Sequence, residues 1–269
     1  MTIFSFLQTG FLLKAFLGAI LASLATAILS PFISLKRISY MGEALSHVSF
    51  AGIALALFVG WHMNLTALCF VVVVALIIGY ISKHYDLEET NITTVFLSVS
   101  MAAGILLISL KKDYTIDLSS YLFGNVLLVT RSDILHMGFL LVLNALFVVL
   151  LFKELFYMTY HQQMARVFRI PVDTVYYAFL VLIALNIVIA VKVIGVILIT
   201  AELVLPGMIA FNLTRNLRKA IVMSLSYSFL SALVGFSASY WLNIPTGSSI
   251  VLTLFVLFLL SLIARRRKA

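Results

Sequence analysis

Long apolar segments alternate with short polar connections along most of this chain. A helix that crosses the hydrocarbon core of a bilayer needs about 20 mostly apolar residues. Stretches such as FVVVVALIIGY (70–80) are apolar on every side, whereas the strands of a membrane barrel alternate apolar and polar residues. The pattern predicts candidate spans at 12–34, 39–60, 64–82, 91–110, 132–152, 174–191, 195–213, 220–242 and 248–264.

The sixth and seventh of these segments lie close together and would form a tight pair. The fold class predicted is therefore an all-α polytopic membrane protein, a bundle of about eight or nine transmembrane helices. We expect one membrane domain over residues 1–269, because the candidate spans leave no room for a soluble module.

Composition supports a membrane location. Of the 269 residues, 63% are hydrophobic and only 10% are charged, whereas soluble chains are about 45–50% apolar and about 25% charged. So few charges exclude a soluble enzyme and a disordered protein. A single cysteine, Cys69, excludes an intrachain disulfide and a thiolate metal site.

The net charge of +8 is explained by topology rather than by a nucleic-acid partner. Most of the 18 basic residues fall in alternate connections and in the C-terminal RRRK, and Lys and Arg prefer cytoplasmic loops. This places the C-terminal tail inside the cell.

The second candidate span carries two ionisable residues that point to a site. Glu43 and His47 are four residues apart and share one face of a helix, flanked by Tyr40 and Ser46. Ionisable side chains inside a bilayer are costly and mark function by default. A carboxylate and an imidazole one turn apart suit Zn²⁺, Mn²⁺ or Fe²⁺. The pair would serve equally as an ion pair or as a proton relay.

Glu202 is a further candidate metal ligand, since it lies near the middle of an apolar segment, four residues before Pro206. A proline at that point removes a backbone hydrogen bond. Glu202 would either line a transport pathway or be a protonated acid bonded between helices, and the sequence leaves both roles open.

Residues 153–173 mix basic, aromatic and aliphatic side chains in a cytoplasmic connection. A short amphipathic helix here would lie on the lipid surface or dock against a cytoplasmic partner. Met164, Val167 and Phe168 offer apolar side chains for docking. A second short helix is expected in 111–131, where LSSYLFGNVLLV is apolar enough to enter the interface.

Several motifs typical of nucleotide-binding proteins and enzymes are absent from the sequence. There is no G-x-x-x-x-G-K-[ST] stretch, so the chain does not bind ATP through a P-loop, and there is no H-E-x-x-H or G-x-S-x-G. An intramembrane enzyme therefore has no motif to support it.

Four stretches resemble, in the same order, motifs of the membrane permeases of metal-uptake ABC transporters, with the zinc-uptake branch most similar. They are KRISYMGEALSHVSFAGIALA (36–56), YLFGNVLLVT (121–130), VKVIGVILITAELVLPGMIA (191–210) and IPTGSSIVL (244–252). Each motif alone is weak, but four in order across about residues 30–258 are specific.

The resemblance implies a homodimeric permease in the bacterial cytoplasmic (inner) membrane. Such a permease is a transport subunit that is not itself an enzyme and holds no permanently bound cofactor. Cytoplasmic ATPase subunits would drive it, and an extracytoplasmic metal-binding protein would deliver Zn²⁺, Mn²⁺ or Fe²⁺. The Asp and His that line the family's translocation path correspond to Glu43 and His47, with Glu in place of Asp. Ala165 corresponds to the Ala of the family's docking helix, and Arg169 replaces its usual Gly. Glu202 stands where the family has an aliphatic residue.

A secondary, ion-coupled metal transporter is the alternative. Glu43, His47 and Glu202 would then carry protons together with metal. Such carriers are often built from inverted repeats with broken helices at the midplane, and no clear repeat is visible in this sequence.

Overall fold

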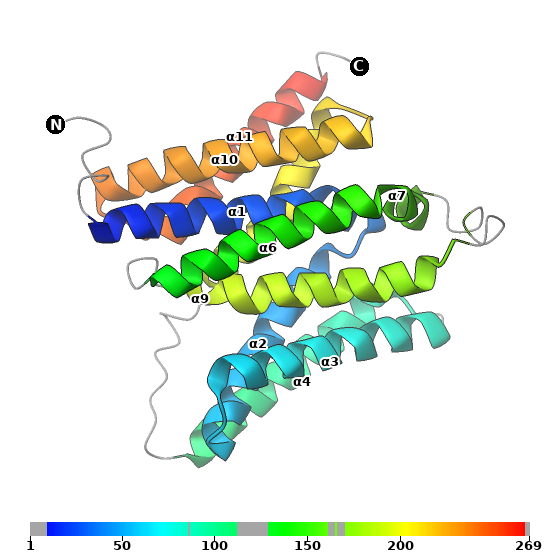
Figure 1. The fold of residues 1–269 in the computed structure, drawn as a ribbon, viewed down its shortest axis with the longest axis vertical. Coiled ribbons are helices and arrows are strands. Elements are labelled where there is room, and N and C mark those ends of the chain that lie inside the picture. The colour runs from blue at the N-terminus through cyan, green and yellow to red at the C-terminus, as the bar shows by residue number, and fades with distance from the viewer. Residues whose placement is uncertain (1–9, 86, 112–128, 161–164, 166–169, 267–269) are drawn as a thin grey trace. The chain divides into compact units, whose positions relative to one another are not determined.

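The computed structural model describes residues 10–85, 87–111, 129–160, 165 and 170–266 (Figure 1). These residues form helices and no strand, so the all-α prediction is confirmed. Eight of the helices are long and apolar enough to cross a membrane, as the hydrophobic pattern predicted. The helices are α1 (Gly10–Lys36), α2 (Ser39–Val59), α3 (Met63–His84), α4 (Glu89–Leu110), α6 (Arg131–Leu150), α7 (Phe152–Tyr160), α9 (Val172–Leu213), α10 (Leu217–Leu242) and α11 (Thr246–Arg266).

The predicted spans 174–191 and 195–213 are joined in one element, α9, of 42 residues. An uninterrupted helix of 42 residues would be about 60 Å long at 1.5 Å per residue, which is roughly twice the hydrocarbon thickness. Helical geometry is interrupted at Gly195, where φ is 77° and ψ is 166°. Glycine adopts this conformation without a Cβ clash. The two expected segments are therefore present and are separated by a break within α9.

Two of the helices end at a Gly or an Asn with a left-handed backbone conformation. Gly60 has φ 83° and donates its N–H to the Ala56 carbonyl at the end of α2. Asn243 has φ 51° and closes α10 in the same way through Ser239. Gly and Asn are the residues that most readily stop a helix like this.

Clustering of contacts divides the chain into two compact units. Unit 1 comprises Met1–Lys36, Ser119–Leu150 and Ile189–Ala269. Within it α1 packs against α6 and α10, and α10 packs against α11 (Figure 1). Unit 2 comprises Arg37–Leu118 and Leu151–Val188, and within it α2 packs against α3 and α4. A single permease domain remains a prediction for the chain as a whole.

Small polar side chains connect the helices of unit 1. Asn144 of α6 donates its amide to the Ala25 carbonyl of α1 at 2.8 Å. Ser224 of α10 donates its hydroxyl to the Ala27 carbonyl at 2.7 Å. Hydrogen bonds of this kind hold membrane helices together, because lipid supplies no hydrophobic force between them.

One end of unit 1 is strongly basic. The α9–α10 turn and the end of α11 meet there, since Arg265 donates to the Asn212 side chain at 3.2 Å and Asn212 donates to Ser261 at 3.0 Å. The Ser34 hydroxyl near the end of α1 donates to the α9 carbonyl of Val204. Basic residues at this end include Lys36, Arg215, Arg218, Lys219, Arg265 and Arg266.

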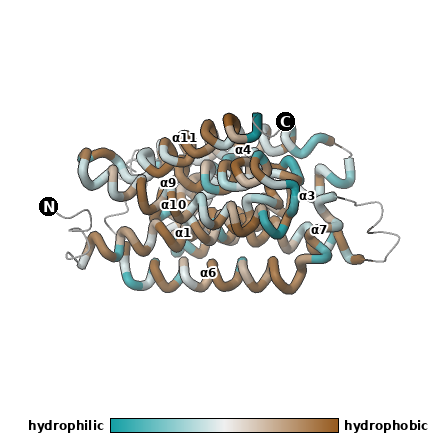
Figure 2. Tube along the Cα trace, turned by 90° about the horizontal axis from the view of Figure 1, so that it is seen from above, coloured by the Kyte–Doolittle hydropathy of each residue, from teal (hydrophilic) through white to brown (hydrophobic). Residues whose placement is uncertain are grey.

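The start of α6 carries an ion pair. Lys192 of α9 lies 2.8 Å from a carboxylate oxygen of Asp133, and the Thr130 N–H and hydroxyl both donate to the other oxygen. In Figure 2, α6 is hydrophobic along most of its length and hydrophilic at its first turn. The charge asymmetry between the two ends of unit 1 agrees with a cytoplasmic basic end.

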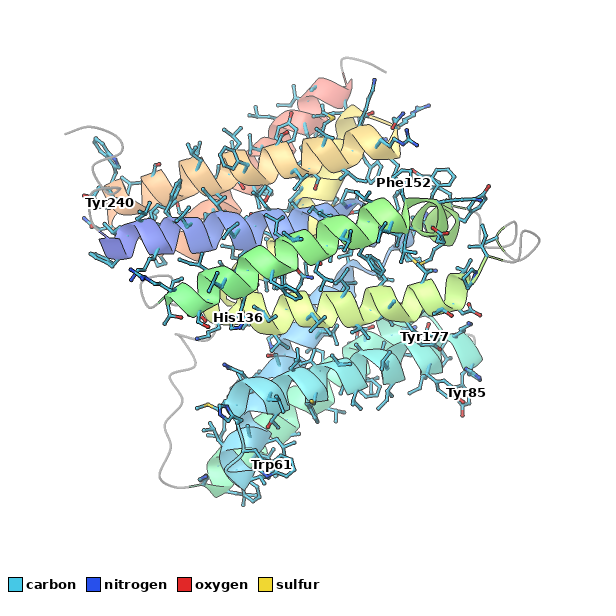
Figure 3. The ribbon with its side chains drawn as sticks, viewed as in Figure 1. Trp61, Tyr85, His136, Phe152, Tyr177 and Tyr240 are labelled. Atoms are coloured by element: carbon cyan, nitrogen blue, oxygen red, sulfur yellow. The ribbon has the colours of Figure 1, made fainter. Side chains whose placement is uncertain are left out.

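Aromatic residues mark both ends of α3 in unit 2. Trp61 precedes the helix and Tyr85 follows it, and both side chains are exposed (Figure 3). Trp and Tyr are enriched at the two membrane–water interfaces. Their positions therefore fit a helix that spans a bilayer.

Candidate functional site

Glu43 and His47 lie one turn apart on α2. Both side chains are partly exposed, whereas residues 44–46 and 48–50 on either side of His47 are buried. Tyr40, one turn before Glu43, is 41% exposed. The three residues form a stripe that the chain's own described helices leave partly uncovered, as a pair of metal-contacting side chains requires.

Ser46 takes a different place from the one expected. Its side chain is fully buried, and its hydroxyl donates to the Gly42 carbonyl at 2.8 Å. Tyr40 therefore flanks the exposed stripe as predicted, whereas Ser46 packs into the interior of the chain.

Within the described part of the chain, no group of three or more His, Cys, Asp or Glu side chains is arranged to hold a metal ion. Glu43 and His47 thus contribute one carboxylate and one imidazole from one chain. A structural zinc site has four protein ligands, so this pair by itself is an open, incomplete ligand set. Such a set suits an ion that binds and leaves.

Glu202 lies in the interior of unit 1 and has no exposed surface. Ser228 of α10 donates its hydroxyl to Glu202 Oε2 at 2.7 Å, and Ser23 of α1 and Ser231 of α10 lie beside the same carboxyl. Three helices, α1, α9 and α10, therefore converge on this acid through serine side chains.

Two buried oxygens of this cluster have no hydrogen-bond partner among the described residues. They are Glu202 Oε1 on α9 and Ser23 Oγ on α1. A proton on the carboxyl would satisfy both atoms, because a protonated acid donates one hydrogen bond while it accepts others. This arrangement favours an acid that joins helices over a ligand that faces a pathway.

The serine cluster was not predicted from the sequence, although the sequence carries a signal for it. Ser224, Ser228 and Ser231 follow one another at intervals of four and three residues along α10. Residues at these intervals share a helix face. A polar face on an otherwise apolar span predicts contact with other helices rather than with lipid.

The predicted docking segment, 153–173, is described in part. It includes α7, in which Leu155 and Met158 are buried. Ala165 has no exposed surface, and its carbonyl accepts the Ile170 N–H at 3.0 Å. Met164, Val167 and Phe168 lie outside the described residues, as does most of the short helix expected in 111–131. A contact between Ala165 and a partner would require its side chain to be uncovered first.

Comparisons with known proteins assign the family. The family model described as the ABC 3 transport family matches residues 8–265. The manganese transport system membrane protein MntC of Listeria innocua is 31% identical over 255 residues, covering 95% of this chain and 91% of that protein. The chelated iron transport system membrane protein YfeD of Yersinia pestis is 31% identical over 253 residues, with coverages of 94% and 85%.

A solved structure agrees with these relatives. PsaBC from Streptococcus pneumoniae, in complex with a Fab, superimposes with a TM-score of 0.84 at 31% identity. The match covers 96% of this chain and 94% of that one. The predicted location in the bacterial inner membrane as a multi-pass protein is confirmed by these relatives together with the eight candidate spans. The chain therefore belongs to the ABC 3 transport family, as a membrane permease of the metal-uptake class that its four motifs predicted.

Proposed function

We propose that this chain is the permease subunit of an ATP-driven importer that moves a divalent transition metal across the cytoplasmic membrane. Glu43 and His47 would contact the ion as it passes. The observation that carries the proposal is their placement one turn apart on the partly exposed stripe of α2. Family membership and the names of the relatives, which transport manganese and chelated iron, support it.

Zinc is our first candidate for the cargo, with Mn²⁺ and Fe²⁺ as alternatives. Imidazole and carboxylate ligands suit all three ions, and the four motifs are most similar to the zinc-uptake branch. The relatives are named for manganese and iron. Affinity alone separates these ions poorly, because ligand geometry and metal availability decide selectivity.

We propose that the transporting unit contains two copies of this chain. One chain supplies one carboxylate and one imidazole, so a two-fold axis would bring together two of each. That set gives four ligands, and the distances between them would change when the two copies move relative to each other. Release requires a site that is not too tight, and a set shared between two subunits meets this need.

Energy would come from separate ATPase subunits, because the sequence has no P-loop. We propose that they dock on the cytoplasmic segment 153–173, through Met164, Val167 and Phe168, with Ala165 packed beneath them. An extracytoplasmic metal-binding protein would deliver the ion at the opposite side of the membrane.

Uptake by the complex in proteoliposomes tests the metal-contacting pair. We expect His47→Ala to abolish ATP-dependent uptake of Zn²⁺, Mn²⁺ or Fe²⁺, and Glu43→Gln to reduce it severely. Both variants should still assemble with the ATPase, because neither side chain is fully buried. Ile53→Ala, a change at a half-buried residue on another face of α2, is the matched control.

Two results would overturn the proposal. Wild-type uptake by the double variant Glu43→Gln/His47→Ala would make the pair structural. Uptake by the permease without ATP or an ATPase, driven by an ion gradient, would support the secondary transporter instead.

A further inference from the structure

Close backbone contacts hold α2 against its neighbours in unit 2. A Cβ atom added at Gly52 of α2 would lie 2.8 Å from the Ala67 Cα of α3. A Cβ at Gly104 of α4 would lie 2.8 Å from the Phe50 ring and 3.3 Å from the Ala51 Cα, both on α2. Small residues at such crossings let membrane helices approach closely. If α2 slid against α3 or α4, the close contacts at Gly52 and Gly104 would be lost, so these three helices are expected to move together.

The first part of α9 is joined to α3 by a third glycine contact. A Cβ at Gly79 of α3 would lie 2.5 Å from Leu180 Cδ1 and 3.2 Å from the Tyr176 ring, both on α9. Leu180 is fully buried and Tyr176 nearly so. The α3–α9 contact is made by side chains of α9, whereas the contacts at Gly52 and Gly104 also reach the backbone of the facing helix.

Polar contacts join the start of α9 to α3 and α4. The Tyr176 hydroxyl donates a hydrogen bond to Glu89 Oε1 at the first turn of α4. Asp173 lies 2.5 Å from Lys83 Nζ at the end of α3. The ion pair is partly exposed and therefore contributes little to stability. The part-buried Tyr176–Glu89 hydrogen bond and the Gly79 contact are therefore the stronger connections.

We propose that α2, α3, α4 and the first half of α9 move as one rigid body that carries movement of the cytoplasmic segment 153–173 to Glu43 and His47. α9 begins at Val172, within the last two residues of this segment. Gly79, Tyr176 and Glu89 are then positioning residues for transport, since they act on the metal-contacting pair through the packing of the helices. This inference rests on the proposed function above.

The coupling ratio, metal transported per ATP hydrolysed by the reconstituted complex, tests these residues. We expect Gly79→Ala to lower the ratio several-fold, because the new methyl group meets Leu180. Adding Leu180→Ala should restore much of it, since the clashing atom is then gone. Tyr176→Phe should also lower the ratio, whereas Tyr177→Phe on the adjacent residue is the matched control. A ratio unchanged by both Gly79→Ala and Tyr176→Phe would overturn the assignment.

A distance measurement tests the rigid body directly and does not depend on transport. Spin labels would be placed at Phe58→Cys on α2 and Thr174→Cys on α9, both exposed, in a Cys69→Ala background. Labelled chains are mixed with excess unlabelled chains, so that distances within one chain dominate. We expect the same distance distribution in the full complex without nucleotide and with ATP. A shift between the two states would overturn the rigid body.

The two proposals fail in different ways. If the double variant Glu43→Gln/His47→Ala transports normally while the label distance stays constant, the metal-contacting role fails and the rigid body stands. If that variant is inactive and the distance changes with ATP, only the rigid body fails.

Discussion

The Ser228 hydroxyl donates a 2.7 Å hydrogen bond to Glu202 Oε2 in the interior of unit 1. The two residues come from adjacent helices, α10 and α9, and neither side chain has exposed surface. The Ser23 side chain of α1 lies beside the same carboxyl group. Through this hydrogen bond Glu202, which lies in the third motif (191–210), joins α9 to α10.

Glu202→Gln separates a structural role from a pathway role. An amide keeps an acceptor for Ser228 and a donor for Ser23, so we expect nearly wild-type metal uptake and expression. A strong loss of uptake with intact assembly would instead favour Glu202 as a pathway ligand. Uptake by the reconstituted complex is the measurement.

Glu202→Leu should destabilise the permease. The Ser228 hydroxyl would lose its carboxylate partner inside the bundle, at a cost of about 1–3 kcal/mol for an unsatisfied buried group. We expect a lower thermal transition in detergent than for Glu202→Gln, which is the control. Equal stability of the two variants would argue against the serine cluster as a support for the fold.

Glu43→Asp introduces the residue that the resemblance to metal-uptake permeases implies for this position. The carboxylate is retained and moves back by one methylene, so we expect uptake to persist with a changed preference among Zn²⁺, Mn²⁺ and Fe²⁺. Competition between the three ions during uptake measures the preference. Loss of all uptake would show that the longer arm of Glu43 is itself required.

Gly195→Ala should lower stability, because φ at this residue is 77°. A side chain in this backbone region costs about 1–3 kcal/mol. Gly138→Ala on α6 is the matched control, since nothing lies within 4 Å of the added Cβ and Ala is favoured over Gly in helices by about 0.5–1 kcal/mol. A comparison of thermal transitions should therefore show a drop for the first variant only.

Phe168→Asp should prevent complex formation with the ATPase, because a docking surface must bury apolar side chains. Lys153→Ala on α7 exchanges an exposed side chain of the same segment and serves as the control. Co-purification with the ATPase subunit measures assembly. Normal co-purification of Phe168→Asp, and of Phe168→Asp combined with Val167→Asp, would contradict docking through these residues.

The sequence alone predicted eight or nine membrane segments with their approximate bounds, and the shared face of Glu43 and His47. The structure has eight candidate spans among its described residues, because the sixth and seventh segments lie in the single element α9. Bilayer thickness sets the length of an apolar segment, and helical periodicity places residues four apart on one face. The break between the sixth and seventh segments was also predictable, although the sequence did not show that Gly195 interrupts one continuous element.

The partners of Glu202 and the contacts at Gly52, Gly79 and Gly104 were decided by tertiary structure. In a membrane protein, lipid-facing and helix-facing residues are both apolar, because lipid tails supply no hydrophobic force that would sort them. Hydrophobic pattern therefore marks where a helix crosses the bilayer, and it leaves open which of its faces meets another helix. Only packing brought Ser23 and Ser228 from distant parts of the chain to one carboxyl, and only packing showed which glycines lie at helix crossings.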